Sequence, residues 1–223
     1  MPVYLLNEHP LFPDPEGAED GIVAIGGDLT PERLLAAYNA GIFPWYSKDE
    51  PIMWWSPDPR FILKPSSVRI SKSMKKVLRG QEFKITYNQA FESVIQSCAS
   101  TPRKDQEGTW ITEEMSTAYK YLHQLGYAQS VEVWKETKLV GGLYGVVIGK
   151  CFFGESMFSH ISNASKAGFV TLVKRLEEEE FDLIDCQIET AHLTSLGAEP
   201  ISRKDFLLRL EKNRSNDPKG VWL

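Results

Sequence analysis

Residues 129–158 read QSVEVWKETKLVGGLYGVVIGKCFFGESMF. Three segments of this stretch, at 129–134, 139–148 and 151–158, are rich in the β-branched and aromatic residues that favour strands. The polar residues between the first two segments, and a Gly-Lys pair between the last two, are typical of turns. The stretch therefore predicts three consecutive antiparallel strands, around which the rest of the fold is arranged.

The sequence after this stretch alternates helix and strand. Asn163 is a candidate N-cap for a helix to about residue 179, and residues 181–188, FDLIDCQI, predict a short apolar strand. Ser202 and Asp205 have the spacing of a capping box for a final helix. The order of strand, strand, strand, helix, strand and helix predicts an α+β domain, with a mainly antiparallel sheet flanked by helices.

The first half of the chain is predicted to be mostly helix and loop. Four helices are expected, starting at residues with good capping ability, at Thr30, Ser71, Asn88 and Thr112. The stretch 42–61 contains too many prolines for a long helix or a central strand. We therefore predict a small N-terminal domain with an aromatic loop at residues 1–68 and a larger domain at residues 69–223.

The composition is that of an ordinary globular protein. The chain has 223 residues, of which 42% are hydrophobic and 25% charged, so disordered, fibrous and collagen-like chains are excluded. No apolar stretch reaches the roughly 18–20 residues that a membrane helix needs. The N-terminal residues do not resemble a secretory signal, and the three cysteines form neither a CxxC pair nor a disulfide framework. We expect a cytoplasmic protein with no membrane partner.

Positive charge is concentrated in one segment. The net charge is −5, but residues 1–59 carry 2 basic and 10 acidic side chains, whereas residues 60–84 carry 8 basic side chains and one acidic one. A basic segment of this kind is either an ordinary solvated helix face or a surface that binds a phosphate backbone. The total charge alone argues against a nucleic-acid partner, and its distribution removes that argument.

Familiar catalytic motifs are missing from the sequence. There is no GxSxG, HExxH or GxxxxGK[ST], and the four histidines lack the spacing of metal ligands, so no metal is expected. Two apolar segments nevertheless contain a carboxylate, Glu155 in FFGESMFS and Asp185 in LIDCQI. Because strand side chains alternate, Asp185 and Gln187 should face the same side. Each carboxylate either caps a helix or meets a buried arginine, or belongs to a functional site; two in one small sheet favour a shared polar site.

Tryptophans are the other conspicuous residues. Trp45, Trp54 and Trp55 lie in the proline-rich stretch, and Trp110 lies in EGTWIT further along the chain. They are either core residues of a small domain or a platform on which a nucleotide base stacks. Because the basic segment begins five residues after Trp55, stacking is favoured for at least one of them.

Five segments together resemble one protein family. They are GIVAIGGDLTPERLLAAYNAGIFPWYS at 21–47, PIMWWSPDPR at 51–60, EGTWIT at 107–112, GGLYGVVIGKCFFGESMFSHISNASKAG at 141–168 and LIDCQIETAHLTSLGAEPISRKDF at 183–206. In this order they closely resemble the bacterial leucyl/phenylalanyl-tRNA–protein transferases, from about residue 10 to about residue 210.

The resemblance implies an aminoacyltransferase. Such an enzyme moves leucine or phenylalanine from aminoacyl-tRNA to the N-terminal amino group of proteins that begin with Arg or Lys, which marks them for degradation in the N-end rule pathway. The implied fold is a small N-terminal domain followed by a domain similar to GCN5-related acyltransferases. No cofactor is needed, because the aminoacyl ester is already activated. Nothing in the sequence requires an oligomer, and we expect a monomer.

Matching residue by residue, the resemblance also implies individual roles. Gln187 would lie next to the attacking amine, Asp185 would orient that glutamine, and Glu155 would receive the basic N-terminus of the acceptor. The pocket for the leucyl or phenylalanyl side chain would be formed by Leu143, Phe152, Met157, Leu172 and Ile184, with Ser159 at its edge. The 3′ adenosine of the tRNA would lie among Tyr38, Trp45, Trp110 and Tyr119. The tRNA backbone would follow Arg69, Lys72, Lys75, Lys76 and Arg79.

Each of these roles has a plainer alternative. The five apolar pocket residues are alternatively ordinary core residues. An acetyl-CoA-dependent N-acyltransferase remains a second function, which the segment SNASKAGFV disfavours because it lacks closely spaced glycines to hold a pyrophosphate. A third function, a non-catalytic RNA-binding module, would use only the basic segment and the tryptophans, and would not depend on Asp185 or Glu155.

Overall fold

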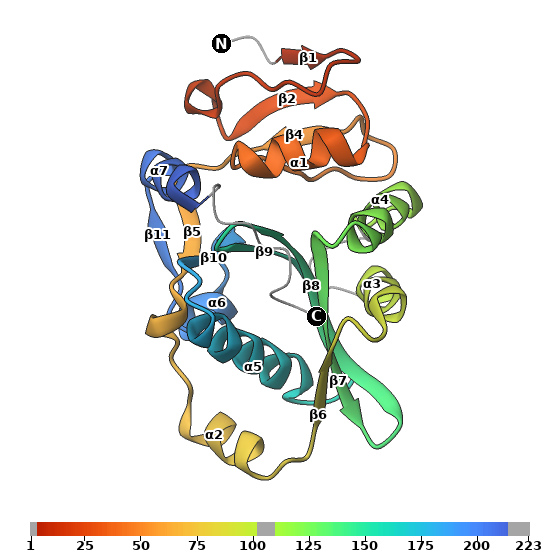
Figure 1. Cartoon of the computed structure of the whole chain (residues 1–223), viewed down its shortest axis with the longest axis vertical. Helices are drawn as coiled ribbons and strands as arrows, with labels where there is room; N and C mark the ends of the chain where they lie inside the picture. The colour runs from red at the N-terminus through yellow and green to blue at the C-terminus, as the bar shows by residue number, and fades with distance from the viewer. Residues whose placement is uncertain (1–3, 102–109, 214–223) are drawn as a thin grey trace.

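The computed structural model describes residues 4–101 and 110–213, and these residues form two β-sheets (Figure 1). The smaller sheet lies at the top of Figure 1 and has the strand order β1-β2-β4-β3. Its strands are β1 (Tyr4–Leu6), β2 (Ile22–Gly26), β3 (Phe43–Pro44) and β4 (Met53–Trp55). Helix α1 (Pro31–Asn39) lies between this sheet and the larger one.

The larger sheet has seven strands within the described residues, in the order β11-β5-β10-β9-β8-β7-β6. Its strands are β5 (Arg60–Leu63), β6 (Lys84–Tyr87), β7 (Ala128–Lys135), β8 (Lys138–Ile148), β9 (Cys151–Ser159), β10 (Leu183–Gln187) and β11 (Glu199–Ile201). Neighbouring strands are antiparallel except β9 and β10, which are parallel. This mainly antiparallel sheet, flanked by helices, confirms the predicted α+β class.

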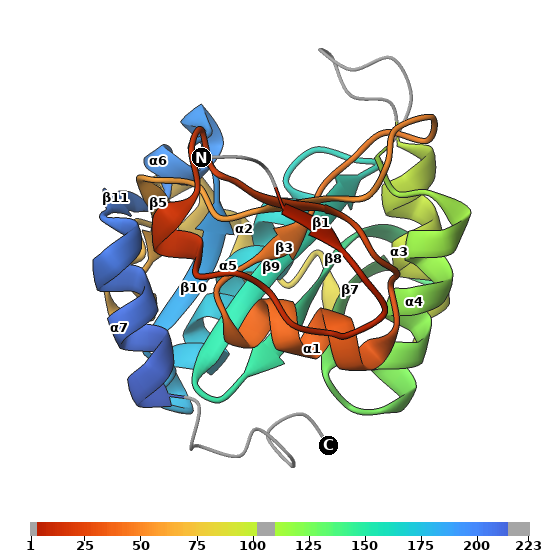
Figure 2. The same cartoon turned by 90° about the horizontal axis from the view of Figure 1, so that it is seen from above.

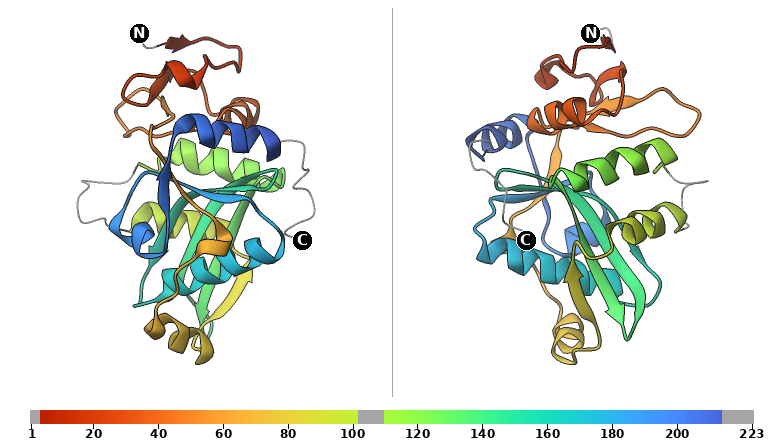
Figure 3. Two further views of the ribbon diagram at one scale, coloured as in Figure 1. Left: turned by 90° about the vertical axis from the view of Figure 1, so that its left-hand side faces the viewer. Right: turned by 45° about the vertical axis from the view of Figure 1, so that its right-hand side comes forward.

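Helices cover both faces of the larger sheet (Figure 1, Figure 3). Helices α3 (Phe91–Ser100) and α4 (Glu113–Gln124) pack on one face, and α5 (Ala164–Glu178) packs on the other. Helix α2 (Lys72–Arg79) lies at the end of the molecule far from the small sheet, whereas α7 (Arg203–Asn213) lies near α1 (Figure 2). The remaining helical segments are η1 (Pro15–Gly17), η2 (Pro65–Ser67) and α6 (Ala191–Ser195). No helix in the described ranges is long and apolar enough to cross a membrane.

The alternation of β8 shows why the sheet has helices on both sides. Leu143 and Val147 join the apolar cluster that contains the buried face of α5. Tyr144 and Val146 point the other way, into the cluster with α3 and α4. Each face of the strand therefore buries its own apolar layer, which is the pattern of a strand in the middle of a two-sided core.

The C-terminal prediction and several helix starts are confirmed. The three predicted strands are β7, β8 and β9, and α5 and β10 follow them in the predicted order. Ser71 and Thr112 accept hydrogen bonds from the N–H groups of Met74 and Met115, so both cap their helices. Ser202 and Asp205 form the expected capping box.

Three predicted caps make no side-chain cap. Thr30 precedes α1, but its hydroxyl donates to Asp28 Oδ1 and does not accept an N–H group of the helix. Asn88 lies before α3 with a positive φ of 57°, and its side chain bonds to Gln129 and to the N–H of Ser130 instead. Asn163 has a φ of 69° and makes no side-chain cap; the Ser159 hydroxyl accepts the N–H of Ser165 at the start of α5. At the start of α3 the Glu132 carboxylate accepts the N–H of Ala90, so at both α3 and α5 a residue outside the helix takes the acceptor role predicted for the asparagine.

The small sheet is missed by the sequence patterns. Its strands are only two to five residues long, and β4 is an inner strand, paired with β2 and β3, inside the stretch whose prolines argued against a central strand. Short strands of this kind depend on pairing with distant residues, such as Tyr4 with Ala24 and Ala24 with Trp54. Strand β5 pairs within the larger sheet although it precedes the predicted domain boundary after residue 68.

One buried arginine ties α7 to the N-terminal region. Arg203 donates from Nη1 to the carbonyl oxygen of Ser56 at 2.6 Å and from Nη2 to the carbonyls of Glu16 and Ala18. Its backbone N–H donates to the Asp58 carboxylate at 3.0 Å. A single buried guanidinium thus donates to three carbonyl groups of the N-terminal region.

Candidate active site

A pocket of about 440 Å³ opens where the parallel strands β9 and β10 separate. Their pairing ends at Asp185 and Phe153; beyond this point β9 continues to Ser159, whereas β10 ends at Gln187. Residues of both strands line the pocket, together with residues from β3, β8, α5 and the start of α6. Most of its wall is apolar, and its polar groups include Glu155, Asp185 and Gln187.

Glu155 sits at a β-bulge in β9. The pairing with β8 runs from Tyr144 opposite Ser156 directly to Gly145 opposite Gly154, so Glu155 has no residue opposite it. Gly145 is required here, because a Cβ atom at this position would lie 2.2 Å from the carbonyl oxygen of Phe153. Bulges re-aim side chains, and this one turns the carboxylate towards α1 and α4.

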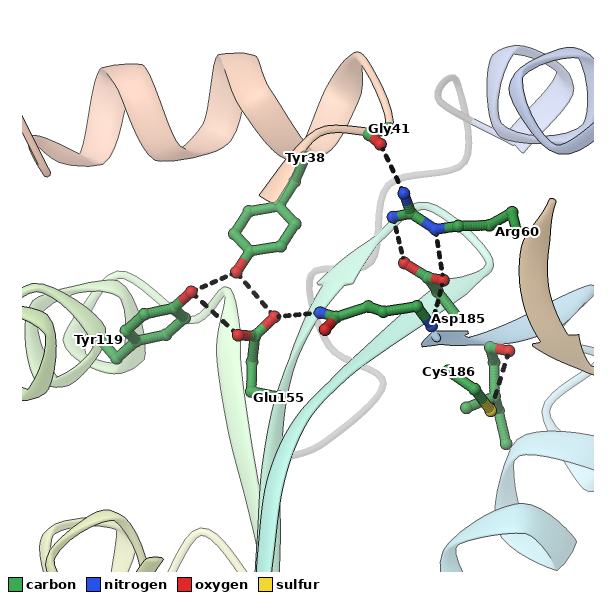
Figure 4. Close-up of polar contacts among 9 residues, drawn as sticks. Tyr38, Gly41, Arg60, Tyr119, Glu155, Asp185 and Cys186 are labelled. Carbon is green, nitrogen blue, oxygen red and sulfur yellow. Dashed lines mark hydrogen bonds and ion pairs between the residues drawn. The ribbon is translucent and has the colours of Figure 1, made fainter. Parts of the chain in front are cut away.

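The Glu155 carboxylate accepts three hydrogen bonds (Figure 4). The Tyr38 hydroxyl, on α1, donates to Oε1 at 2.7 Å, and the Tyr119 hydroxyl, on α4, donates to Oε2 at 3.0 Å. The two hydroxyl oxygens are also in contact with each other; because each hydroxyl carries one proton, a hydrogen bond between them replaces one of the two bonds to Glu155. Gln187 donates from Nε2 to Oε1 at 3.2 Å. A carboxylate oxygen has two lone pairs, so Oε2 can still accept one more donor.

Burial controls the ionisation of this cluster. It raises the pKa of Glu155 to about 7, against the opposing effect of the two tyrosine hydroxyl groups; the nearby Asp185 charge also raises it and Arg60 lowers it. Burial and the Glu155 charge raise the pKa values of Tyr38 and Tyr119 well above their usual range. The tyrosines therefore remain donors at neutral pH, while Glu155 is divided between its neutral and ionised forms.

Asp185 forms a fully buried ion pair with Arg60. Arg60 donates from Nε to Oδ1 at 2.8 Å and from Nη2 to Oδ2 at 2.6 Å, a two-point contact that matches the planar carboxylate. The same guanidinium donates from Nη1 to the carbonyl oxygen of Gly41 at 3.0 Å (Figure 4). Arg60 is one of the eight basic residues counted in segment 60–84, but it is not part of an exposed basic surface, because Asp185 neutralises its charge in the interior.

Gln187 ends β10 in a left-handed conformation with a φ of 64°. Its backbone N–H donates to Asp185 Oδ1 at 2.9 Å, and its side-chain amide donates to Glu155. Ile184 and Cys186 pack in the α5 cluster. The pairing of β10 with β5 is irregular between Asp185 and Gln187, so the regular alternation by which the sequence places these two side chains on one side is interrupted here. The backbone of Gln187 is therefore held by Asp185, and the side chain of Gln187 is held by Glu155.

The apolar wall differs in part from the predicted set. Leu143, Phe152, Met157 and Ile184 line the pocket. Leu172 does not line it. This residue of α5 is fully buried in the apolar core, which agrees with the alternative that it is an ordinary core residue. Ser159 is also away from the pocket, because its hydroxyl bonds at the start of α5. Phe169 lines the pocket instead, one helical turn before Leu172.

The four predicted aromatic residues fall into two pairs. Trp45 and Trp110 line the pocket and are partly exposed. Tyr38 and Tyr119 are fully buried and bind Glu155, which corrects the expectation that they surround an adenosine. Trp54 is a core residue, and its indole N–H donates to the carbonyl oxygen of Gly26.

The basic segment forms an exposed surface on and before α2, which we call the α2 basic face. Its members are exposed to solvent, namely Arg69, Lys72, Lys75, Lys76 and Arg79. Met74 is the buried residue by which α2 attaches to the larger domain. Five cations in eleven residues, with no acidic residue among them, create a strong local positive field.

Two further residues at the pocket were not singled out by the sequence. Cys186 and His192 both line it. Burial raises the pKa of the Cys186 thiol above its usual range, so the sulfur is not a ready nucleophile. Burial and the Lys166 charge lower the pKa of His192. Across residues 4–101 and 110–213, no group of three or more His, Cys, Asp or Glu side chains is arranged to hold a metal ion.

Comparison with known proteins gives a consistent match over the chain. The family model described as leucyl/phenylalanyl-tRNA protein transferase matches residues 62–211, and the model of the N-terminal domain of that family matches residues 27–58. Similar proteins bear the name leucyl/phenylalanyl-tRNA–protein transferase. The one from Syntrophus aciditrophicus is 53% identical over 100% of this chain and 94% of its own length. The one from Desulfatibacillum aliphaticivorans is 57% identical over 93% of this chain and 89% of its own length.

Among solved structures, the fold resembles a GCN5-related N-acetyltransferase from Kribbella flavida. The two share 8% sequence identity with a TM-score of 0.38, over 77% of this chain and 61% of that one.

Proposed function

Because the chain belongs to the leucyl/phenylalanyl-tRNA protein transferase family, we propose that it transfers leucine or phenylalanine from aminoacyl-tRNA to proteins whose first residue is Arg or Lys. The enzyme is an aminoacyltransferase with an aminoacyl-tRNA and a protein as substrates. The observation that carries the finer proposal is the pocket between β9 and β10, which is apolar along its wall and carries Glu155 and Gln187. The product is a protein marked for N-end rule degradation, and we expect the enzyme to act as a cytoplasmic monomer.

The reaction is an aminolysis that needs little help from the protein. The acceptor nitrogen forms a bond to the ester carbonyl carbon, the bond from that carbon to the ribose oxygen breaks, and the amine loses a proton that the departing hydroxyl gains. Since the ester is activated already, the protein mainly has to position the two groups and lower the cost of moving the proton. The side-chain amide of Gln187 donates from its Nε2 to Glu155. Among the contacts of the described residues, the Oε1 oxygen of Gln187 itself is available to accept an N–H of the attacking amine.

Glu155 supplies the preference for a basic acceptor. Its Oε2 can accept one more donor, and a buried carboxylate binds an ammonium or guanidinium much better than a neutral group. A neutral first residue would leave the ionised carboxylate with no cation beside it, which disfavours such acceptors. Asp185 supplies no such site, because Arg60 already engages both of its oxygens.

The apolar wall receives the aminoacyl side chain. The side chains of Leu143, Phe152, Met157 and Ile184 contain only carbon and sulfur, and Phe169 also lines the pocket. Such a wall favours leucine and phenylalanine by removing their surface from water. Trp45 and Trp110 lie at the same pocket, and we assign them to stacking on the terminal adenosine.

Phe169 and Leu172 provide a test of this wall. Phe169→Leu is expected to raise the ratio of kcat/KM for Phe-tRNA over Leu-tRNA by about tenfold, because the shorter side chain leaves room for the larger substrate. The matched variant Leu172→Val should lower stability by about 1 kcal/mol and leave the ratio within about twofold. Competition between the two charged tRNAs measures the ratio. A larger change of the ratio in Leu172→Val would indicate that Leu172 contacts the aminoacyl side chain.

The α2 basic face is assigned to the tRNA backbone. Lys75→Ala combined with Lys76→Ala should weaken tRNA binding and reduce the slope of log affinity against log salt concentration by about one for each lysine that contacts a phosphate. Filter binding at several salt concentrations measures this slope. Lys204→Ala with Lys212→Ala removes the same charge from the exposed side of α7 and serves as the control. Equal slopes for both double variants would exclude the α2 basic face from binding.

The proposed reaction is tested by mixing the protein with radiolabelled Leu-tRNA and a peptide that begins with Arg. Label should move to the peptide, and far less should move to a peptide that begins with Gly. No transfer under conditions in which a relative of the family is active would overturn the proposal. An RNA-binding module without catalysis would bind the tRNA in the same experiment and leave the ester intact.

A further inference from the structure

Arg60 occupies an unusual position between the two sheets. It is fully buried in β5, and its guanidinium lies between two aromatic rings, 4.8 Å from the centre of Phe43 and 4.5 Å from the centre of Phe206. Nε and Nη2 bind Asp185, and Nη1 binds the carbonyl oxygen of Gly41, which follows α1. One side chain thus contacts β10, the end of α1, the start of β3 and α7.

The contacts of Arg60 close a ring around the active site (Figure 4). In one direction the ring runs from Arg60 to Asp185, then to the N–H of Gln187, and from the Gln187 amide to Glu155. In the other direction it runs from Arg60 to Gly41 and along α1 to Tyr38, whose hydroxyl reaches the same Glu155 oxygen. Every member of this ring except Arg60 and the backbone of Gly41 has a role argued above.

We propose that Arg60 is a positioning residue of the transferase, which sets the distance between Gln187 on β10 and Glu155 with its tyrosine on α1. The inference rests on the proposed function, since positioning is defined by the transfer reaction. Arg60 itself touches no substrate, because it is buried behind Asp185. It acts on two groups at once, the backbone of Gln187 and the C-terminal end of α1.

A purely structural arginine is present for comparison. Arg203 is also buried, also binds several carbonyl groups and also joins the N-terminal region to the rest of the chain. It has no hydrogen bond to Asp185, Gln187, Glu155 or Tyr38 among the contacts of the described residues. Arg203→Lys therefore provides a matched variant that weakens the same kind of contact without opening the ring.

The decisive variant is Arg60→Lys, which keeps the positive charge but cannot span both Asp185 oxygens and the Gly41 carbonyl. We expect kcat for transfer from Leu-tRNA to an Arg peptide to fall at least about tenfold, with a smaller change in KM for Leu-tRNA, because reacting groups lose rate when they are misplaced by a fraction of an ångström. Because the basic acceptor binds the ionised form of Glu155, we expect the rate to rise with pH through the pKa of that carboxyl. In Arg60→Lys this rise should move to higher pH, by about half a unit or more, because Tyr38 no longer stabilises the ionised form.

This pH shift separates positioning from loss of stability. The groups that face Glu155 are Tyr38 on α1, Tyr119 on α4, Asp185 and Gln187 on β10, and Arg60 on β5. Arg60→Lys changes no charge among them, so a shift reports a change of geometry. Arg203→Lys should lose thermal stability to a similar extent and keep both the wild-type kcat and the wild-type pH dependence.

The outcomes are distinct. A kcat near that of the wild type in folded Arg60→Lys overturns the proposal. The proposal is also overturned if Arg60→Lys loses kcat without a pH shift and Arg203→Lys shows the same loss of kcat. If Arg60→Lys does not fold, Phe206→Leu removes one ring from the guanidinium and should give the same changes to a smaller degree; wild-type kinetics in Phe206→Leu would then count against the proposal. Absence of leucine transfer by the wild type would instead contradict the proposed function.

Discussion

Asp185→Ala is expected to lower the free energy of unfolding by about 3–5 kcal/mol and to reduce transfer at least about 100-fold. The first effect follows because the variant leaves the Arg60 charge buried without its partner. The second follows because the N–H of Gln187 loses the acceptor that fixes its left-handed backbone. Binding of tRNA should change little, since neither residue belongs to the α2 basic face. Chemical denaturation and the transfer assay, each at equal folded fraction, measure the two effects.

A double variant separates the two effects of this substitution. Arg60→Met with Asp185→Leu replaces the ion pair by apolar side chains that fit beside Phe43 and Phe206. A buried ion pair replaced in this way is often neutral or stabilising, so most of the lost stability should return. Transfer should remain as low as in Asp185→Ala. Recovery of transfer together with stability would mean that the pair only supports the fold.

Glu155→Gln is expected to reduce kcat/KM for Arg peptides about 100-fold or more and to remove most of the preference for Arg over neutral first residues. Truncating one partner of a buried charged contact costs roughly 2–5 kcal/mol, which corresponds to this loss. The amide has nearly the shape of the carboxylate but only one acceptor oxygen, so one of the two tyrosine hydroxyl groups keeps its acceptor and the other faces the amide NH2 group. Peptides that differ only in their first residue, Arg against Ala, measure the discrimination. Retained discrimination would exclude Glu155 from acceptor recognition.

The same variant should be more stable than the wild type above neutral pH. Burial raises the pKa of Glu155 from 4.5 to about 7, so the folded protein binds this proton more tightly than the unfolded chain does. The stability that this proton gives is complete below about pH 4.5 and is lost as the pH rises through 7. At pH 8 the wild type therefore bears the cost of a buried charge that Glu155→Gln avoids. The difference in melting temperature should shrink towards pH 5, and a constant difference would contradict the assignment of the pKa to Glu155.

The parts of the site that lie close together in the sequence were predictable from it. The apolar segments around Asp185 and Gln187 and around Glu155 make these three polar side chains conspicuous. The bulge that aims Glu155 was not predictable, because it is defined by the pairing of β9 with β8. The sequence signal for the bulge is Gly145, where the backbone of β8 lies too close to the carbonyl oxygen of Phe153 for a Cβ atom. This glycine can be interpreted only once the pairing register of β8 and β9 is known.

Contacts between distant residues account for the errors. Arg60 and Asp185 are 125 residues apart, so the sequence counts Arg60 with the exposed cations that follow it. Tyr38 and Tyr119 come from two helices that meet only in the fold, and their burial makes them partners of Glu155 rather than of a nucleotide. Leu172 and Phe169 are one turn apart on α5, and only the packing of that helix decides which of them reaches the pocket.

We propose that the pocket between β9 and β10 holds the aminoacyl group with its ester next to Gln187 and Glu155. A crystal structure with a phenylalanyl-adenosine analogue, in which an amide replaces the ester, tests it most directly. We predict the phenyl ring among Leu143, Phe152 and Met157, the carbonyl carbon within reach of an amine held by Gln187, and the adenine against Trp45 and Trp110. A phenyl ring bound outside this pocket, or an adenine remote from both tryptophans, would contradict the claim.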